Sequence, residues 1–460
     1  MDSVTTEAQA RPRVGRAAIA SWLTFDWATQ PFFTIVTTFV FGPFFVAHVA
    51  ANPVEGQALW GYSLSAAGLI IALMSPPLGA IADASGARKP WIAAFSLLLI
   101  GGSAALWWAE PGVDGAIMIA LVAFAIATIG AEFATVFTNA MMPDLVDRGR
   151  LGRLSGTGWA VGYIGGLVGL AIVLGLMVGS PETGKTLFGM DPILGLDPSR
   201  FGGDRGSGPF SALWYLIFAL PLFFFVPDLP QRMAIGTAVR VGLRDLKGTL
   251  MQVRRDPNAA RYLLSHMIYI DGLGALMAFG AIYASSTFEW STIELGLFGI
   301  ILLVVGIAGS LIGGSLDDRI GPKRVIALSL LILTLASIGF LSVDREHILF
   351  FVAVPPPTDG GGLFESVGEK AYLVFGILVG LVAGPLQAAS RTLLVRVSPG
   401  GKITQYFGLY ALSGKITSFA GPFAVGTLTA LAGSQRIGIS ILLAFFIVGL
   451  MILVRVKQDP

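Results

Sequence analysis

Five ionisable side chains interrupt long apolar segments of this chain: Asp26, Glu132, Asp271, Arg391 and Lys415. A charge at the depth of the lipid hydrocarbon costs about 2.5–3.5 kcal/mol, so such groups usually face a water-filled cavity or a partner of opposite charge. Three acids and two bases could form a site for a charged or zwitterionic solute, with one acid carrying a proton. They could instead form salt bridges that close a gate, and one pair could do both.

The best proton carrier among these acids is the one with the weakest basic partner. Burial favours the neutral carboxyl group, whereas a nearby cation favours the ionised one. Glu132 has no basic residue within a helical turn and is the first candidate, and Asp271 is the second because His266 lies five residues before it. Asp26 and Asp271 occupy equivalent places in the two halves of the chain and could share the two buried bases.

Other polar and aromatic side chains accompany these charges and could bind a solute by hydrogen bonding or stacking. They are Gln30, Asn139, Trp159, Tyr163, Tyr269, Gln387 and Tyr410. For any one of them alone, packing between helices is the more common role.

The elements that carry these residues must cross a membrane. The chain has 460 residues, of which 54% are hydrophobic and only 13% charged, and its mean hydropathy is +0.77. A soluble domain of this length needs far more charged surface. The apolar residues form blocks of about twenty, the length of a membrane-spanning helix, and they do not alternate as in a β-barrel.

Twelve such blocks predict an all-α membrane protein. The expected segments are 18–49, 58–82, 90–109, 114–142, 153–179, 211–227, 260–286, 293–316, 323–342, 371–396, 404–431 and 436–456. Of the 30 Lys and Arg residues, 22 lie on the side of the two termini and six on the opposite side. Cytoplasmic loops carry the excess of Lys and Arg, so both termini are expected in the cytoplasm.

The longest loop on that side divides the chain into two sets of six helices. We predict a cytosolic tail at 1–17, a first six-helix bundle at 18–227, a cytoplasmic linker at 228–259 and a second bundle at 260–456. Both halves carry one motif, and each residue of the second copy follows its counterpart by 235 positions. The copies are Gly79, Asp83, Gly86, Arg88 and Lys89, and Gly314, Asp318, Gly321, Lys323 and Arg324.

This repeat resembles the G-x-x-x-D-x-x-G-x-R-K signature of the major facilitator superfamily. The resemblance implies a fold of two pseudo-symmetric six-helix bundles, and it gives the motif residues a gating role. In that fold helices 1, 4, 7 and 10 line the central cavity, and four of the five buried charges fall on them, one on each. We therefore expect all five charges to face the space between the bundles.

Further stretches look like the Atg22-like (UMF1) branch of the superfamily, the bacterial relatives of a yeast vacuolar effluxer. They include Trp22–Ala28, Thr138–Asp144, Leu154–Gly166, Tyr269–Gly272, Gln387–Arg391 and Phe407–Lys415. The resemblance implies a solute carrier, with efflux of amino acids as the activity proposed for the family.

Enzymatic chemistry finds little support in the sequence. The chain has no cysteine, which excludes disulfides and thiolate metal sites. Residues 179–186 match a phosphate-binding loop, but they follow a membrane segment instead of a buried strand, so the match is attributed to chance. Asp317 and Asp318 lie in a basic loop that is not a metal site. We predict no enzyme, no metal and no cofactor.

The sequence thus predicts a secondary transporter that moves a small polar or zwitterionic solute by alternating access, with proton coupling. A lipid flippase or drug exporter on the same fold is the alternative, and a membrane-embedded enzyme is a more distant one. The expected partners are a small-molecule substrate and membrane lipid, without nucleic acid, and the expected state is a monomer. The expected location is the inner (cytoplasmic) membrane of a cell.

Overall fold

The computed structural model describes residues 14–180, 183–288, 290, 292–355, 363–399 and 401–457. In the N-terminal half, the first membrane segment runs from Arg16 to Val49. It consists of α1 (Arg16–Pro31), a π-helical stretch (Phe32–Phe39), α2 (Phe41–Phe44) and a second π-helical stretch (Phe45–Val49). The other helices of this half are α3 (Pro53–Ser85), α4 (Lys89–Ala105), α5 (Ala116–Leu145), α6 (Leu151–Ile172) and α7 (Gly202–Phe225).

The predicted linker contains α8 (Ile235–Arg255). The C-terminal half then contributes α9 (Pro257–Phe288), α10 (Thr292–Ile320), α11 (Pro322–Leu341), α12 (Val367–Val397), α13 (Ile403–Lys415), α14 (Ala420–Ala432) and α15 (Gln435–Val454). A short hairpin of β1 (His347–Ile348) and β2 (Val352–Ala353) precedes α12.

The helices begin where local chemistry satisfies their first N–H groups. Asn52 accepts the N–H of Glu55 at 3.0 Å, and Pro53 occupies the first turn of α3. Ser366 and Glu369 form a reciprocal capping box at the start of α12, with N···O distances of 3.1 and 2.9 Å. Such caps fix the first residue of a membrane helix that hydrophobicity alone places only approximately.

Within the described ranges, eleven helices are long and apolar enough to cross a membrane. The segment predicted at 404–431 is not one helix, because a turn at 416–419 separates α13 from α14. The two short helices together occupy the place of the eleventh segment. The predicted sixth segment, 211–227, begins earlier than expected, at Gly202.

Glycines allow the two halves to touch at two places. A Cβ atom on Gly79 of α3 would lie 2.6 Å from the carbonyl oxygen of Thr404 on α13. A Cβ atom on Gly314 of α10 would lie 2.6 Å from the carbonyl oxygen of Gly152 on α6. These distances leave no room for a side chain, so each glycine lets a helix of one half lie directly against a helix of the other.

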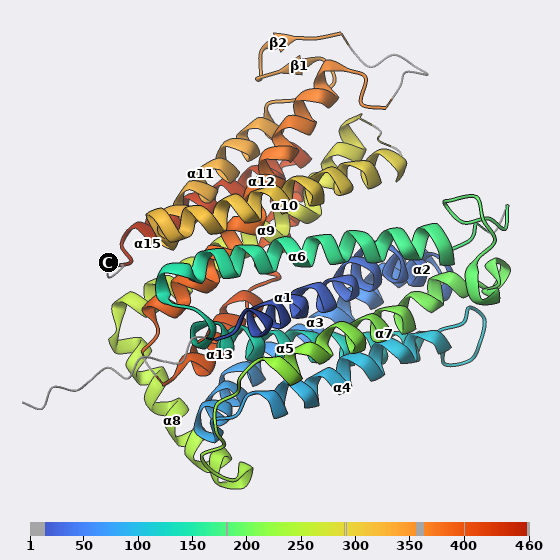
Figure 1. Ribbon diagram of the computed structural model, residues 1–460. Coiled ribbons are helices and arrows are strands. Elements are labelled where there is room, and N and C mark those ends of the chain that lie inside the picture. The colour runs from blue at the N-terminus through green and yellow to red at the C-terminus, as the bar shows by residue number, and fades with distance from the viewer. Residues whose placement is uncertain are drawn as a thin grey trace, which may run out of the picture.

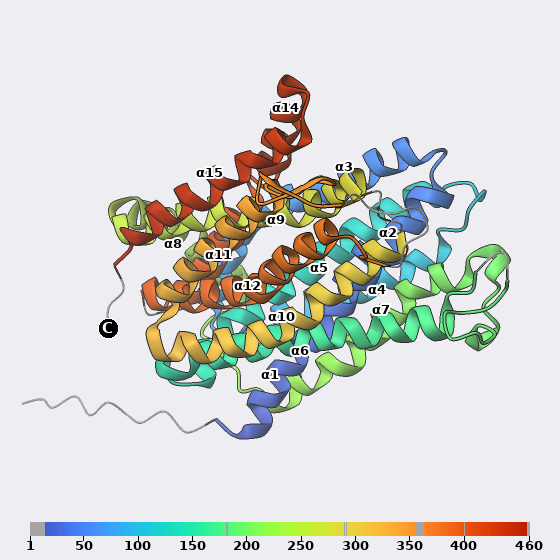
Figure 2. The same ribbon diagram turned by 90° about the horizontal axis from the view of Figure 1, so that it is seen from above.

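Both contacts lie toward one end of the molecule, which we call the motif end. It carries the two motif loops, 85–89 and 320–324, together with α8 and the C-terminus. Figure 1 shows the two halves side by side near this end and further apart toward the end that carries β1 and β2. Figure 2 shows α14 beside α15 at the edge of the C-terminal half. The structure is therefore of the two-bundle type, with its halves joined at the motif end.

Replacing Gly314 by Val should separate α10 from α6. Overpacking of this kind costs about 1–3 kcal/mol, which would favour the separated state roughly fivefold to a hundredfold. The chain has no native cysteine, so Ser310→Cys can report the change, because Ser310 is fully buried and its carbonyl oxygen would lie 2.4 Å from a Cβ on Gly156. We expect a water-soluble maleimide to label this cysteine faster in Gly314→Val.

The matched control is Gly296→Val on the same helix, where a Cβ would meet no atom within 4 Å. Equal labelling rates in the two valine variants would contradict close packing of α10 on α6.

Candidate functional site

Arg391 joins the two halves through a set of polar contacts. It lies on α12 and is 5% exposed. Its guanidinium donates to Asn139 Oδ1 at 2.9 Å, and to the hydroxyl and carbonyl oxygens of Ser155 at 3.0 and 2.9 Å. Its Nη1 also lies 3.6 Å from Asp26 Oδ2, and its carbon Cζ lies 5.5 Å from the centre of the Trp159 ring. A side chain of the C-terminal half is thus held entirely by α1, α5 and α6.

Small residues make room for this arrangement on the side of the N-terminal half. A Cβ atom on Gly158 would lie 2.3 Å from Asp26 Oδ2. The planar guanidinium offers donors in a fixed fork, so one residue can bond several oxygens at once. We call Asp26, Asn139, Ser155 and Trp159 the arginine socket.

A second ion pair crosses the halves deeper in the membrane. Lys415 Nζ, at the end of α13, lies 2.7 Å from Glu132 Oε1 on α5. Their side chains are 32% and 22% exposed, whereas the side chain of Arg391 is only 6% exposed. Water or a solute can therefore reach the Glu132–Lys415 pair more easily than the arginine socket.

The two pairs lie at different depths. Arg391 is six residues from the end of α12 at Val397, and at a rise of about 1.5 Å per residue this is about 9 Å. Lys415 is twelve residues from the start of α13 at Ile403, or about 18 Å. The interface thus carries one ionic contact near the motif end and a second one nearer the middle of the membrane.

Asp271 lies apart from these pairs. It is 5% exposed, on α9, and its carboxylate lies near Thr417 in the turn between α13 and α14. A Cβ atom on Gly421, at the start of α14, would lie 2.8 Å from the carbonyl oxygen of Asp271. In the described part of the chain, no Lys or Arg lies within 4.0 Å of its carboxylate.

These positions correct the expected pairing. Glu132 was expected to be the acid without a basic partner, and this is wrong, because Lys415 approaches it from the other half. Asp26 pairs with Arg391, but Asp271 shares neither base. Four of the five buried charges lie at the contact between the halves, and Asp271 instead faces the turn in the C-terminal half. By the criterion of the weakest basic partner, Asp271 replaces Glu132 as the first candidate for a proton carrier.

The polar and aromatic candidates divide into two groups. Asn139 and Trp159 hold Arg391, and the Tyr163 ring, 5.6 Å from that of Trp159, lies against Gly306 and Gly384 of the other half. The other four, Tyr269 among them, bond or stack within their own half. Gln30 has a weak contact of 3.5 Å with Thr34, Gln387 donates to the carbonyl of Ala383, and Tyr410 stacks on His266 at 3.9 Å.

Three serine hydroxyl groups and one imidazole contribute to the site without having been predicted, beside Tyr269, which was a candidate. Ser155 accepts a hydrogen bond from Arg391. Behind Arg391, the hydroxyl groups of Tyr269 and Ser390 lie 2.6 Å apart, and His266 Nδ1 lies 2.8 Å from Ser413 Oγ. All five are buried. Ser155, Ser390 and Ser413 all fall inside stretches that resemble the Atg22-like branch, which is the one signal that could have marked them.

The first motif copy binds the start of α13. Asp83 accepts the backbone N–H groups of Thr404 and Gln405 at 3.2 and 2.8 Å. Arg88 donates to Thr404 Oγ1 at 3.1 Å and lies 2.6 Å from Asp144. A carboxylate at a helix N-terminus is stabilised by the free N–H groups and by the helix dipole.

The second copy binds the start of α6 in the same way. Asp318 accepts the backbone N–H of Gly152 at 2.9 Å and lies 3.3 Å from Arg153 Nε. Both copies therefore cap a helix of the opposite half. The loops also match, because Gly86 and Gly321 have φ of +89° and +88°, a region that favours glycine.

The remaining motif bases act within their own halves. Lys89 donates to the carbonyl of Phe223 at 2.8 Å, and Lys323 donates to the carbonyls of Val454 and Val456 at the end of α15. Arg324 is exposed. The two aspartates, not the bases as a set, therefore cap helices of the opposite half at the motif end.

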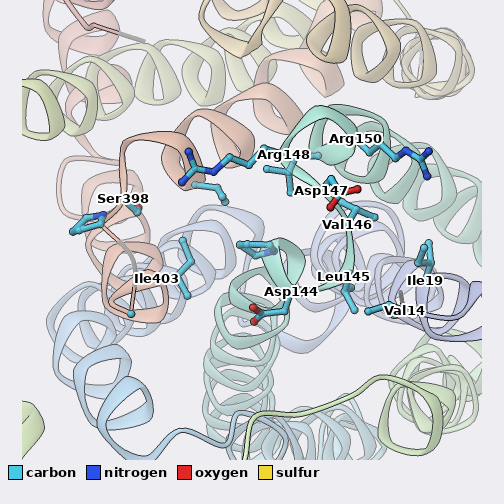
Figure 3. A pocket seen from close by; sticks show the side chains of 15 residues that line it. Val14, Ile19, Asp144, Leu145, Val146, Asp147, Arg148, Arg150, Ser398 and Ile403 are labelled. Carbon is cyan, nitrogen blue, oxygen red and sulfur yellow. The ribbon is translucent and has the colours of Figure 1, made fainter. Parts of the chain in front are cut away.

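A hollow of about 670 Å³ lies at the motif end, between the connection from α5 to α6 and the connection from α12 to α13. Figure 3 shows Asp144, Arg148, Arg150, Ser398 and Ile403 around it. Its walls come from both halves, so the hollow lies at the surface of the motif end, where the two halves meet. Among the described residues, no group of three His, Cys, Asp or Glu side chains could hold a metal ion.

Comparisons with known proteins agree with this geometry. Residues 43–460 match the family described as "Vacuole effluxer Atg22 like". An MFS-type transporter of Bacillus subtilis, YxiO, is 24% identical over 446 residues, which cover 95% of this chain and 94% of that protein. Autophagy-related protein 22 of Cryptococcus neoformans is 27% identical over 315 residues, which are 67% of this chain and 53% of that protein.

Solved structures show the same fold. The human organic anion transporter MFSD10 has a TM-score of 0.68 at 14% identity, and the match covers 95% of this chain and 99% of that one. The major facilitator FucP in its outward conformation has a TM-score of 0.67 at 16% identity, with 96% and 99% covered.

Removing the charge of Asp318 should loosen the motif end. Asn can still accept the N–H of Gly152, but it loses the attraction to the helix N-terminus and to Arg153, worth about 1–2 kcal/mol in a partly buried geometry. In the Asp318→Asn variant we expect the maleimide to label the cysteine of Ser310→Cys roughly fivefold to thirtyfold faster than in the parent. The variant protein should remain in the membrane. Asp83→Asn should likewise speed the labelling of a cysteine at Ser75, which is fully buried on α3.

The control is Asp114→Asn, an exposed change in a loop at the other end of the molecule. Labelling that stays at the level of this control in both motif variants would show that the caps do not hold the gate.

Proposed function

The chain belongs to the Atg22-like family of major facilitator transporters, and from this premise we propose that it is a secondary transporter of a small zwitterionic solute, such as an amino acid. The observation that carries the proposal is the distribution of charge at the interface. Both acids, Asp26 and Glu132, belong to the N-terminal half, and both bases, Arg391 and Lys415, belong to the C-terminal half.

Opening of the motif end must separate these pairs. A buried charge that loses its partner is strongly unfavourable, so the empty protein resists the change. A zwitterion brings a carboxylate for one base and an ammonium group for one acid, and it can take the place of a broken pair. Its binding therefore lowers the cost of the transition, which is the differential interaction that alternating access requires.

The two pairs support different roles. Glu132 and Lys415 are partly exposed and make a single contact of 2.7 Å, so we assign the substrate site to them. Arg391 has bonds to Asn139 and Ser155 besides its contact with Asp26, and it is buried, so we assign it to the gate. The lipid flippase and drug exporter alternatives find less support, because a lipid or an apolar drug would not replace the charges of a broken pair.

Proton coupling is a second part of the proposal, and we assign it to Asp271. This acid is buried without a basic partner among the described residues, and it faces the turn that follows Lys415. Burial without a compensating cation favours the neutral acid, so a proton can accompany the solute.

The orientation follows from the excess of Lys and Arg at the motif end, which we propose faces the cytoplasm of a cell bounded by this membrane. The closed motif end then corresponds to an outward-facing state, and the family resemblance favours export. Because one chain supplies both halves of the interface, a monomer is sufficient.

Exchanging the charges of Glu132 and Lys415 distinguishes two roles of this pair, closing the gate and binding the solute. In Glu132→Lys with Lys415→Glu, the ion pair can form again, so labelling of Ser310→Cys should stay near the parent rate. A solute whose carboxylate and ammonium positions are fixed should no longer fit, and losing a charged hydrogen bond costs about 1.5–3 kcal/mol. We expect KM for counterflow of a radiolabelled amino acid to rise about tenfold to a hundredfold.

The single variants Glu132→Gln and Lys415→Gln serve as controls. In both we expect faster labelling of Ser310→Cys than in the parent and a raised KM, because neither can form the ion pair again. A double variant with the parent KM would show that the pair closes the gate without binding the solute. A test series of neutral amino acids, a sugar and choline in proteoliposomes would also reveal a substrate of another class.

Asp271→Asn should uncouple transport from the proton. The neutral amide can keep its contact with Thr417 but cannot release a proton. Accumulation driven by a pH gradient should be lost in proteoliposomes, while exchange of labelled for unlabelled solute at equal pH continues. Glu132→Gln, by contrast, should lose both the accumulation driven by a pH gradient and the exchange at equal pH. Accumulation that persists in Asp271→Asn, or a requirement for sodium, would rule out this assignment.

A further inference from the structure

The second motif copy contains a buried acid that the first copy lacks. Asp317 precedes Asp318 and is 1% exposed. The equivalent residue of the first copy, 235 positions earlier, is Ala82, which is also buried. The motif aspartate is Asp318, which caps α6, so helix capping does not explain the presence of Asp317.

Asp317 lies where three helices meet at the contact between the halves. Thr392 of α12 donates its hydroxyl to Asp317 Oδ2. Gly152 of α6 packs directly on the acid, since a Cβ at that glycine would lie 2.5 Å from Asp317 Cβ. The other oxygen, Oδ1, is buried and has no hydrogen-bond partner among the described residues, and Arg396 Nη2 lies 3.9 Å from it.

Other charged groups around Asp317 are engaged elsewhere. Asp318, on the same helix, caps α6 and lies beside Arg153. Arg391, one residue before Thr392, points into the arginine socket. Arg396 is therefore the cation that faces Asp317, and its distance exceeds that of a hydrogen bond. An anionic carboxylate in this place has one buried oxygen that accepts no hydrogen bond from the described residues, which makes the anion unfavourable when the gate is closed.

We propose that Asp317 is a proton-binding site of the gate, protonated when the motif end is closed and ionised when it is open. Opening breaks the cap between Asp318 and Gly152 and draws α6 away from α10, so water reaches the carboxylate. The proton is then released to the motif side, and closure takes a proton up again from the same side. No proton crosses the membrane at this site, and low pH on the motif side stabilises the closed state.

A purely structural role for Asp317 predicts the opposite effect of a neutral substitution. If its charge held Thr392 and Arg396 in place, Asp317→Asn would weaken closure. If the closed state requires the neutral acid, Asp317→Asn would imitate that acid, because the amide keeps an acceptor for Thr392. The sign of the change therefore separates the two roles.

The test measures labelling of Ser310→Cys in the full-length protein in nanodiscs between about pH 5.5 and 8.5. Each rate is divided by that of a cysteine at the exposed position Asp114, which corrects for the chemistry of the thiol. In the parent we expect labelling to rise several-fold with pH. In Asp317→Asn it should be low at every pH, and in Asp318→Asn it should be high but still rise with pH.

A second variant keeps the proposal testable if Asp317→Asn does not fold. Thr392→Val removes the hydroxyl that stabilises the anion, so the closed state should persist to higher pH. Labelling of Asp317→Asn that follows the parent pH dependence, or that is raised at every pH, would overturn the proposal. So would a Thr392→Val profile shifted to lower pH.

The inference rests on the proposed function only in needing a gate that opens at the motif end. The labelling assay contains no solute. A failure to transport any amino acid would therefore overturn the proposed substrate and leave this result standing. A flat labelling profile in the parent would overturn the proton site alone.

Discussion

A charge in the membrane interior is stable only with a partner, and this constraint determines how the two halves meet. Among the described residues, the bases within 4.0 Å of Asp26 and Glu132 are Arg391 and Lys415, and both belong to the other half. Closure of the motif end brings a base of the other half within 4.0 Å of each acid. The closed interface is therefore stabilised by groups that each half must expose when the halves separate, so opening requires something else to pair with them.

Close packing makes these contacts possible. Gly79 and Gly314 bring helices of the two halves within direct contact, and only then can Asp83 and Asp318 reach the first N–H groups of α13 and α6. From there inward, the interface passes from carboxylate caps to the arginine socket and then to the more exposed pair of Glu132 and Lys415. The order places the most accessible ionic contact furthest from the closed end, where a solute entering from the opposite side would meet it first.

Much of the fold can be predicted from the sequence, because its signals are local. Apolar blocks of about twenty residues locate the membrane segments, and the motif repeated at Asp83 and Asp318 identifies the two halves. The Glu132–Lys415 contact depends on how the halves are aligned in space, so the absence of a base near Glu132 in the sequence was misleading. The turn at 416–419 was also missed, since glycine and proline occur both beside it and within continuous helices such as α3, which contains Pro76 and Pro77.

The gate consists of two contacts, α3 with α13 and α6 with α10. Both contain a helix capped by an aspartate, but their other charged groups differ. On one side Arg88 of the N-terminal half donates to Thr404 of the other half and pairs with Asp144, so a permanently charged base braces α3 against α13. On the other side its counterpart Lys323 binds carbonyls within its own half, and the extra group at the contact is the acid Asp317. An arginine does not titrate in the physiological range, whereas a carboxyl group can. We infer that the contact between α6 and α10 is the side of the gate that responds to pH, because it holds the additional buried acid, whereas the contact between α3 and α13 has Ala82 at the equivalent position. This asymmetry arises from one motif position, Arg88 against Lys323, and from one position beside the motif, Ala82 against Asp317, which explains how two nearly identical loops can support different roles in one gate.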